Sequence, residues 1–418
     1  MIDSSLTFER PSRSVRYRLI NWGGTTLNSL GLSLASLEEE SLLRESQRIA
    51  RLKDFGDDSF RVPLQKLLES LNKEGNLNFV GQALLRKYLL NLLVNRLRIQ
   101  ENFKRYPEIA KVPIEKPLFV LGLPRSGTTF LHNLLSQDPS SRWLHLWELC
   151  NPLPSPDYNT RETDPRIGEA KKLVESFNSL VPQLSTVHHL NPSGPEECNV
   201  LFEHDLISIL FELRANVPSY TEWLLNQDLV DSYRYYRRQL QLLAWKWSGK
   251  HWLLKAPIHL NYLLALITVF PDARIIHTYR DPLKVVPSLC SLSALFRGVY
   301  TDHLDLKAIG EQWLNWFDII SERSMEMRQA IPNQQIYDLN YLDLVSDPIG
   351  KVRQIYDYLD YDFNPVFEEN LKQYINTNPQ HKHGVHRYSL DQFGLDASKV
   401  NKRFENYCLK FNISSETT

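Results

Sequence analysis

The sequence predicts an α/β protein in which helices flank a parallel sheet. Four short apolar runs are typical of buried strands: LFVLG (118–122), HWLLKA (251–256), ARIIHTY (273–279) and QIYDLNY (335–341). Helical stretches separate these runs, which favours right-handed crossovers and parallel strands with helices on both faces. Ligands of such sheets gather at the carboxyl ends of the strands. The polar residues that follow each run are therefore the first candidates for a site.

A helical region precedes the sheet. Residues 1–113 show only helical periodicity, as in VGQALLRKYLLNLLVNRLRIQENF (80–103), where apolar residues recur every three or four positions. Pro113 and Pro117 then mark an extended connector into the first strand. We expect this boundary to divide the helical region from an α/β domain that occupies residues 114–418.

The first strand runs into a Gly-rich turn and then a helix, in the order LFVLG, LPRSG, TTFLHNLL. Four residues separate Gly122 from Gly127, and Thr128 and Thr129 follow, which is the spacing of a P-loop. Backbone N–H groups and the helix N-terminus converge on an anion in such a loop. The loop has Thr128 where ATPases carry a lysine, and its cation is Arg125. The sequence thus predicts a P-loop-type sheet that binds phosphate but does not perform ordinary ATP chemistry.

A second motif has the same strand–turn–helix order. In FPDARIIHTYRDPLKVVPSL (270–289), the strand ends at a polar turn that carries Arg280, and Ser288 follows eight residues later in the helix. We expect both side chains to face the ligand of the first loop.

With these two motifs the chain resembles the sulfotransferases that use 3′-phosphoadenosine 5′-phosphosulfate (PAPS). Their 5′-phosphosulfate loop, P-[K/R]-[S/T]-G-T-T, matches PRSGTT at 124–129, and they hold the donor's 3′-phosphate with an Arg and a Ser eight positions apart, as Arg280 and Ser288 are here. The resemblance covers residues 50 to 396 and is to the broad bacterial-type branch, with a distant similarity to protein-tyrosine sulfotransferases. Its further segments are GPEEC (194–198), HWLLKAPIHL (251–260), YLDLVSDP (341–348) and HRYSLDQFGL (386–395).

The resemblance implies PAPS as co-substrate, transfer of its sulfuryl group to an acceptor hydroxyl by in-line displacement, and no metal. It assigns stabilisation of the leaving phosphate to Arg125, the loop N–H groups and the threonine hydroxyls. Lys255 ends a predicted strand, where side chains point into the crevice of an α/β sheet, so we expect it to be a second cation on the phosphosulfate. Tyr341 resembles the tyrosine that contacts adenine in this superfamily, and Tyr337 is an alternative. The predicted donor-binding residues of the loop are Arg125, Ser126, Gly127, Thr128 and Thr129.

The proton acceptor is predicted to be a Glu or a His. Glu148 leads, because protein-tyrosine sulfotransferases carry a Glu base in a similar place. His189, beside His188, is the second candidate, because an imidazole titrates near neutrality. Glu196 and Glu197 could orient that histidine, act as the base, or only occupy the first turn of a helix.

The C-terminal segment 380–396 is predicted to close over the donor's 3′-phosphate. Its cationic and aromatic residues include Lys382, His386, Arg387 and Tyr388. The segment departs from the RKG-type motif of the cytosolic relatives. Its three histidines have spacings that a metal could accept, but no cysteine or carboxylate pair accompanies them, so no metal is predicted.

The acceptor side is predicted to be a helical cap at residues 149–247. Aromatic residues there recur at helical spacing, in YRYYRRQLQLLAWKW (233–247), which is more typical of a core than of a surface that stacks bases. No nucleic-acid partner is therefore expected. A small-molecule or carrier-tethered hydroxyl is the expected acceptor, while carbohydrate and peptide tyrosine stay open.

The composition is that of an ordinary enzyme of 418 residues. Lys and Arg total 48 against 49 Asp and Glu, so no global basic field favours nucleic acid or anionic membrane. The apolar runs are too short to span a bilayer, and no basic-then-apolar leader begins the chain, so a cytoplasmic location is expected. Four cysteines without CxxC pairing indicate reduced thiols rather than disulfides or zinc. The sequence carries no signature of an oligomeric state.

Two other classes of protein share part of this pattern. A P-loop kinase acting on a small molecule would need the missing lysine and a metal-holding Asp at a strand end, and no apolar run ends that way. A catalytically inactive nucleotide-binding module would keep both phosphate motifs and lack a base.

Overall fold

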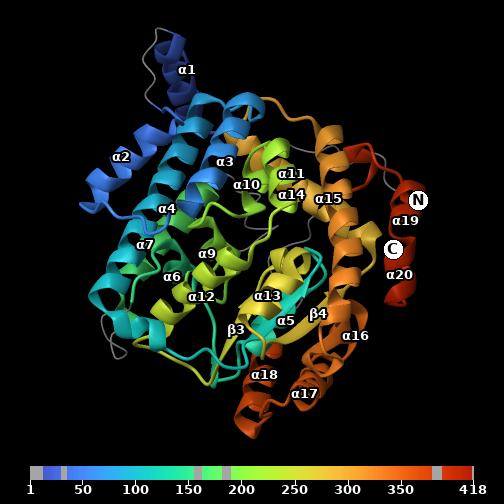
Figure 1. The fold of residues 1–418 in the computed structure, drawn as a ribbon. Coiled ribbons are helices and arrows are strands. Elements are labelled where there is room, and N and C mark those ends of the chain that lie inside the picture. Colours follow the sequence, from blue (N-terminus) through green and yellow to red (C-terminus); the bar gives the residue numbers. More distant parts are fainter. Residues whose placement is uncertain (1–12, 30–34, 155–161, 181–189, 379–387, 417–418) are drawn as a thin grey trace.

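A computed structural model of the chain describes residues 13–29, 35–154, 162–180, 190–378 and 388–416 (Figure 1). Its sheet has five strands in the order β2-β3-β1-β4-β5. Every neighbouring pair is parallel. The strands are β1 (Leu118–Gly122), β2 (Ser141–Arg142), β3 (His251–Lys255), β4 (Arg274–Tyr279) and β5 (Ile336–Asn340).

The four predicted strands are confirmed to within one residue at each end, and two of the differences have a clear reason. The short β2 joins the edge beside β3, where its two residues carry no periodicity that a sequence could display. Tyr341 lies outside β5, because the Asn340 side chain accepts a hydrogen bond from the backbone N–H of Leu342 and starts a helix there.

Helices account for most of the remaining chain. Those before β1 are α1 (Val15–Ser29), α2 (Glu39–Ala50), α3 (Arg61–Glu74) and α4 (Phe79–Arg105). Those between β1 and β3 are α5 (Thr128–Leu135), α6 (Leu146–Cys150), α7 (Pro165–Leu180), α9 (Asn199–Glu203), α10 (Leu210–Arg214), α11 (Pro218–Leu225) and α12 (Val230–Ala244). Those after β3 are α13 (Leu263–Val269), α14 (Pro282–Tyr300), α15 (Leu306–Met327), α16 (Tyr341–Ser346), α17 (Pro348–Leu359), α18 (Pro365–Thr377), α19 (Ala397–Arg403) and α20 (Glu405–Lys410).

Helices cover both faces of the sheet, as predicted. Side chains alternate along β1, so Phe119 and Leu121 enter the large core, while Leu118 and Val120 enter a separate smaller core. The large core also takes side chains from α12, α13, α14 and α15, and the smaller one takes them from α5, α17 and α18. The central strand is buried on both faces, which fixes the loop at its carboxyl end.

The helices that precede the sheet share the large core. Buried leucines of α2, α3 and α4 belong to the same cluster as Phe119 and Leu121 of β1. Helix α1 projects beyond this body at the top of Figure 1. Among the described residues, no helix combines the length and the apolar character that crossing a bilayer requires.

Candidate active site

The loop after β1 is built on glycines that other residues could not replace. A Cβ on Gly122 would lie 2.3 Å from the Thr278 hydroxyl of β4. Gly127 has φ +91°, and a Cβ there would lie 2.6 Å from the Tyr341 ring. The loop is therefore pressed between β4 and α16, with its N–H groups leading into the first turn of α5.

The hydroxyl groups of the loop have different tasks. The Ser126 hydroxyl is buried and lies 2.7 Å from the Thr278 hydroxyl, so it ties the loop to β4 rather than facing a ligand. Thr128 and Thr129 begin α5 and line a large cavity, as Arg125 and Gly127 do.

The PRSGTT loop (124–129) and the Arg280–Ser288 pair, the two phosphate motifs of the sequence, meet in space, as the sequence predicts. The Arg125 Nε donates to the Ser288 hydroxyl at 2.9 Å, and an Arg280 Nη donates to the Arg125 carbonyl at 3.4 Å. Burial lowers the pKa of Arg125, and the charge of Arg280 lowers it further. Two arginines brought together in a partly desolvated place favour the binding of an anion.

Arg280 is held on one face and along one edge. Its guanidinium carbon lies 3.9 Å from the centre of the Tyr341 ring. Its Nε and one Nη each donate to a carboxylate oxygen of Glu416 at 2.8 Å. The Glu416 backbone N–H donates to Asp281 at 2.8 Å, which fixes the Glu416 side chain beside Arg280. Nothing in the local sequence could indicate Glu416, because it lies 136 residues from Arg280.

Lys255 lies at the end of β3 beside the loop. Its side chain is buried, and its Nζ donates to Glu197 at 2.7 Å and to the Thr129 hydroxyl at 3.2 Å. Glu197 lines the cavity together with Glu196. The structure therefore brings an ammonium, a carboxylate and the loop hydroxyl together at the carboxyl edge of the sheet.

Arg125, Thr129, Glu197 and Arg280 lie on the wall of one cavity of about 1250 Å³. That volume exceeds the roughly 300 to 1,000 Å³ of sites for drug-sized ligands. Residues of α4 line it from Ala83 to Arg98, which corresponds to about 22 Å of helix. Beyond the polar groups its walls are mostly apolar and include Leu84, Leu213, Leu292, Phe296, Trp313 and Trp316.

Residues 117–365 match the family model described as Sulfotransferase family. The chain belongs to the sulfotransferase family. It is 25% identical over 284 residues to the omega-hydroxy-beta-dihydromenaquinone-9 sulfotransferase Stf3 of Mycobacterium bovis, which covers 66% of this chain and 71% of that protein. Sulfotransferase STF1 from Mycobacterium tuberculosis H37Rv is similar with a TM-score of 0.80 and 32% identity, over 88% of this chain and 98% of that one. STF9 from Mycobacterium avium is similar with a TM-score of 0.85 and 27% identity, over 92% and 99%.

Glu148, the first candidate for the proton acceptor, does not line this cavity of the sulfotransferase. The carboxylate is buried, forms an ion pair with Arg142, and accepts a hydrogen bond from the backbone N–H of His145 at 3.1 Å. Burial alone would raise the pKa of Glu148, but Arg142 and His145 lower it to about 2. Its neighbours Trp147 and Leu149 line the cavity, and Glu148 itself points away into a structural ion pair.

Five residues that the sequence analysis singled out lie outside the described part of the chain: His188, His189, Lys382, His386 and Arg387. Tyr388 lies inside it. The alternative Tyr337 bonds through its hydroxyl to Gln354 at 3.3 Å and does not line the cavity. Among the described residues, no three His, Cys, Asp or Glu side chains lie together as metal ligands would.

Proposed function

We propose that this sulfotransferase moves a sulfuryl group from PAPS to the hydroxyl of an apolar small molecule. The observation that carries the proposal is the junction of the two phosphate motifs, where Arg125 bonds to Ser288 and Arg280 bonds to the Arg125 carbonyl. An ATP-dependent kinase has no use for a second anion site at this place. A donor with phosphates on both its 3′ and 5′ positions needs one.

The donor would lie across this junction. The N–H groups of the loop and the first turn of α5 suit the 5′-phosphosulfate, because both direct partial positive charge at one point. Arg280 and Ser288 suit the 3′-phosphate, with Arg125 between the two anions. The Tyr341 ring lies beside Gly127 and Arg280, where an adenine could stack, and His386, Arg387 and Tyr388 remain the predicted closing residues.

In the proposed step the acceptor oxygen forms a bond to sulfur while the bond from sulfur to the 5′-phosphate oxygen breaks. Negative charge develops on the leaving phosphate, and the Lys255 ammonium, the Arg125 guanidinium and the Thr129 hydroxyl lie where they would stabilise it. The acceptor's proton goes to a carboxylate, and the products are a sulfate ester and 3′,5′-adenosine bisphosphate.

We propose Glu197 as that carboxylate in place of Glu148. Glu197 lines the cavity and lies 2.7 Å from Lys255, whereas Glu148 is a weak base in a buried ion pair. When the donor draws the Lys255 ammonium toward its phosphosulfate, Glu197 becomes available to the acceptor hydroxyl. His189, which lies outside the described residues, is the second candidate.

The proposed acceptor is an apolar molecule with one free hydroxyl, because most of the cavity wall offers only carbon atoms. The name of the Stf3 relative, which specifies an omega-hydroxy menaquinone derivative, supports the same class of acceptor. A carrier-tethered chain is the second candidate.

Calorimetric titration with 3′,5′-adenosine bisphosphate, beside ATP with magnesium, tests the donor site. We expect the bisphosphate to bind and ATP not to bind, and we expect Arg280→Ala and Ser288→Ala each to weaken binding by about tenfold or more. Arg353→Ala, a surface arginine of α17, and Ser321→Ala, a buried serine of α15, are the matched controls. Preference for ATP would move the chain to the kinase class.

Single-turnover kinetics with PAPS and a soluble alcohol test the base. Glu197→Gln should lower the rate of transfer by about 10² to 10⁴ while bisphosphate binding persists. Glu169→Gln, which removes an exposed carboxylate from the rim of the same cavity, should leave the rate unchanged. An unchanged rate in Glu197→Gln would direct attention to His189.

A further inference from the structure

Helix α1 presents apolar side chains to solvent along one face. Val15, Leu19 and Trp22 are 63%, 64% and 73% exposed. In a helix of 3.6 residues per turn, positions 15, 19 and 22 lie on one side, with Thr26 continuing the row. Isolated exposed apolar residues are ordinary on a protein, whereas apolar residues that gather on one exposed face mark an interaction surface.

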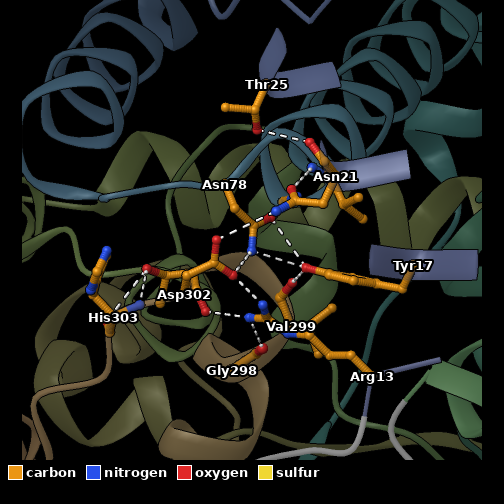
Figure 2. Close-up of polar contacts among 12 residues, drawn as sticks. Arg13, Tyr17, Asn21, Thr25, Asn78, Gly298, Val299, Asp302 and His303 are labelled. Atoms are coloured by element: carbon orange, nitrogen blue, oxygen red, sulfur yellow. Dashed lines mark hydrogen bonds and ion pairs between the residues drawn. The ribbon is translucent and has the colours of Figure 1, made fainter. Parts of the chain in front are cut away.

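The opposite face fastens α1 to the body of the enzyme. Figure 2 shows Arg13 and two residues of the helix, Tyr17 and Asn21, directed at the chain below. The Tyr17 hydroxyl donates to the Val299 carbonyl at 2.6 Å, and Asn21 accepts from the Val80 N–H at 3.2 Å. Arg13, just before the helix, forms an ion pair with Asp302 (Figure 2).

Close packing adds to these polar contacts. A Cβ on Gly24 would lie 2.0 Å from the Phe79 ring, so the helix lies directly on the first turn of α4. The apolar row therefore has a fixed direction relative to the enzyme, and it faces away from the contacts that hold the helix.

The attachment points of α1 adjoin the apolar cavity. Val299, which accepts from Tyr17, precedes Tyr300, and Tyr300 lines the cavity. On α4, Ala83 lines the cavity one turn after the residues that α1 contacts. Two exposed apolar residues, Ile49 at 46% and Leu173 at 43%, also belong to the cavity lining and mark a place where it opens to solvent.

The charge of α1 completes its amphipathic character. The helix contains no Asp or Glu, and its charged residues are Arg16 and Arg18, in a chain whose formal net charge is −1. Helices with Trp and Leu on one face and arginine beside them bind in the interface of a bilayer, where tryptophan is enriched and each basic residue gains about 1 kcal/mol from anionic lipid.

We propose that α1 docks this enzyme on the surface of an anionic lipid bilayer, with Val15, Leu19 and Trp22 in the interface. The purpose of the docking rests on the proposed apolar acceptor, which would pass from the bilayer into the cavity without crossing water. A second copy of the chain, the other candidate to cover this face, would not account for the arginines of a helix that has no Asp or Glu.

Flotation of the full chain with vesicles of phosphatidylcholine and phosphatidylglycerol tests the docking. We expect the wild type to float with these vesicles and Leu19→Glu and Trp22→Glu each to lower the bound fraction by about tenfold. Leu409→Glu is the matched control, because Leu409 is 75% exposed on α20, which Figure 1 places well apart from α1. Circular dichroism would verify that each variant keeps its helix content.

Binding that the two α1 variants leave unchanged, or no binding by the wild type, would overturn the proposal. The proposal would also be overturned if light scattering showed that the wild type is a dimer that does not float with vesicles and that Leu19→Glu dissociates this dimer. Activity measurements on two alcohols separate failure of the docking proposal from failure of the proposed function. Leu19→Glu should sulfate hexanol in solution at the wild-type rate and hexadecanol in vesicles about tenfold more slowly. If the proposed function is wrong, neither the wild type nor the variants will sulfate hexanol, although the wild type will still float with the vesicles.

Discussion

The donor side and the acceptor side of the cavity are built in opposite ways. On the donor side, charged groups at the carboxyl ends of β1, β3 and β4 are fixed by short polar contacts, such as Lys255 to Glu197 and Arg125 to Ser288. On the acceptor side, long helices contribute apolar side chains that any apolar ligand of suitable shape could contact. If the proposed function is right, the donor is recognised by position and charge, and the acceptor by shape and exclusion of water. Changes on the two sides should therefore affect different kinetic quantities.

The largest expected effect is on the donor side, at Lys255. Lys255→Met keeps most of the side-chain volume and removes the ammonium that lies 3.2 Å from the Thr129 hydroxyl. We expect the rate of sulfuryl transfer to fall by about 10² to 10³, since a preorganised charge next to the leaving oxygen is lost in a desolvated place. The apparent affinity for an alcohol should change little. Single-turnover kinetics would measure both, with Lys250→Met, an exposed lysine just before β3, as the control.

Gly127 tests whether the backbone of the loop is as decisive as its charges. Gly127→Ala combines a left-handed φ of +91° with a Cβ that would lie 2.6 Å from the Tyr341 ring. We expect affinity for 3′,5′-adenosine bisphosphate to fall by about tenfold to a hundredfold, because the strain of roughly 1 to 3 kcal/mol must be relieved by moving the loop.

Gly56→Ala is the control for strain alone. Gly56 has φ +88°, and its Cβ would meet only the flexible Gln100 side chain at 3.2 Å, far from the phosphate motifs. Both variants should lose similar stability, and only Gly127→Ala should lose donor affinity. Equal donor affinity in the two would mean that the loop tolerates displacement.

On the acceptor side the expected effect is smaller and depends on chain length. Ala83→Trp would fill part of the cavity along α4. We expect KM for a long-chain alcohol to rise about tenfold, with KM for a short one and the affinity for the bisphosphate unchanged, because a large side chain excludes part of the apolar chain without touching the donor groups. Steady-state kinetics across a series of alcohols would measure it, and a rise that is equal for short and long chains would contradict an elongated acceptor site.

The contrast between the two sides also explains which features the sequence predicts. The residues of PRSGTT are contiguous, and Arg280 and Ser288 are only eight residues apart. In each motif the spacing along the chain therefore determines the spacing in the structure. The four main strands follow in the same way from local apolar runs. The pairing of Glu148 with Arg142 could not be seen, because a Glu after an apolar stretch looks the same whether it faces a cavity or a buried arginine.

Long-range contacts had no local signal either. Glu197 meets Lys255 across 58 residues of sequence, and only the sheet brings them together. The cavity is equally hidden, because an apolar residue at helical spacing, such as Leu213 or Trp316, predicts burial against protein and burial against a ligand alike. The placement of the proposed base and the shape of the cavity therefore depended on tertiary structure.

The smallest expected effect concerns the side-chain carboxylate of Glu416, which pairs with Arg280. Glu416 takes the Nε edge of Arg280, where its charge would oppose the arrival of the proposed donor's 3′-phosphate. Glu416→Gln should raise the affinity for 3′,5′-adenosine bisphosphate by about three- to fivefold, in line with the modest free energy of a partly exposed ion pair. Calorimetric titration would measure the change, with Glu405→Gln of α20 as the control. Lower affinity in Glu416→Gln would instead mean that the carboxylate orients Arg280 so that its remaining Nη groups face the phosphate, and the C-terminus would then belong to the donor site rather than compete with the donor.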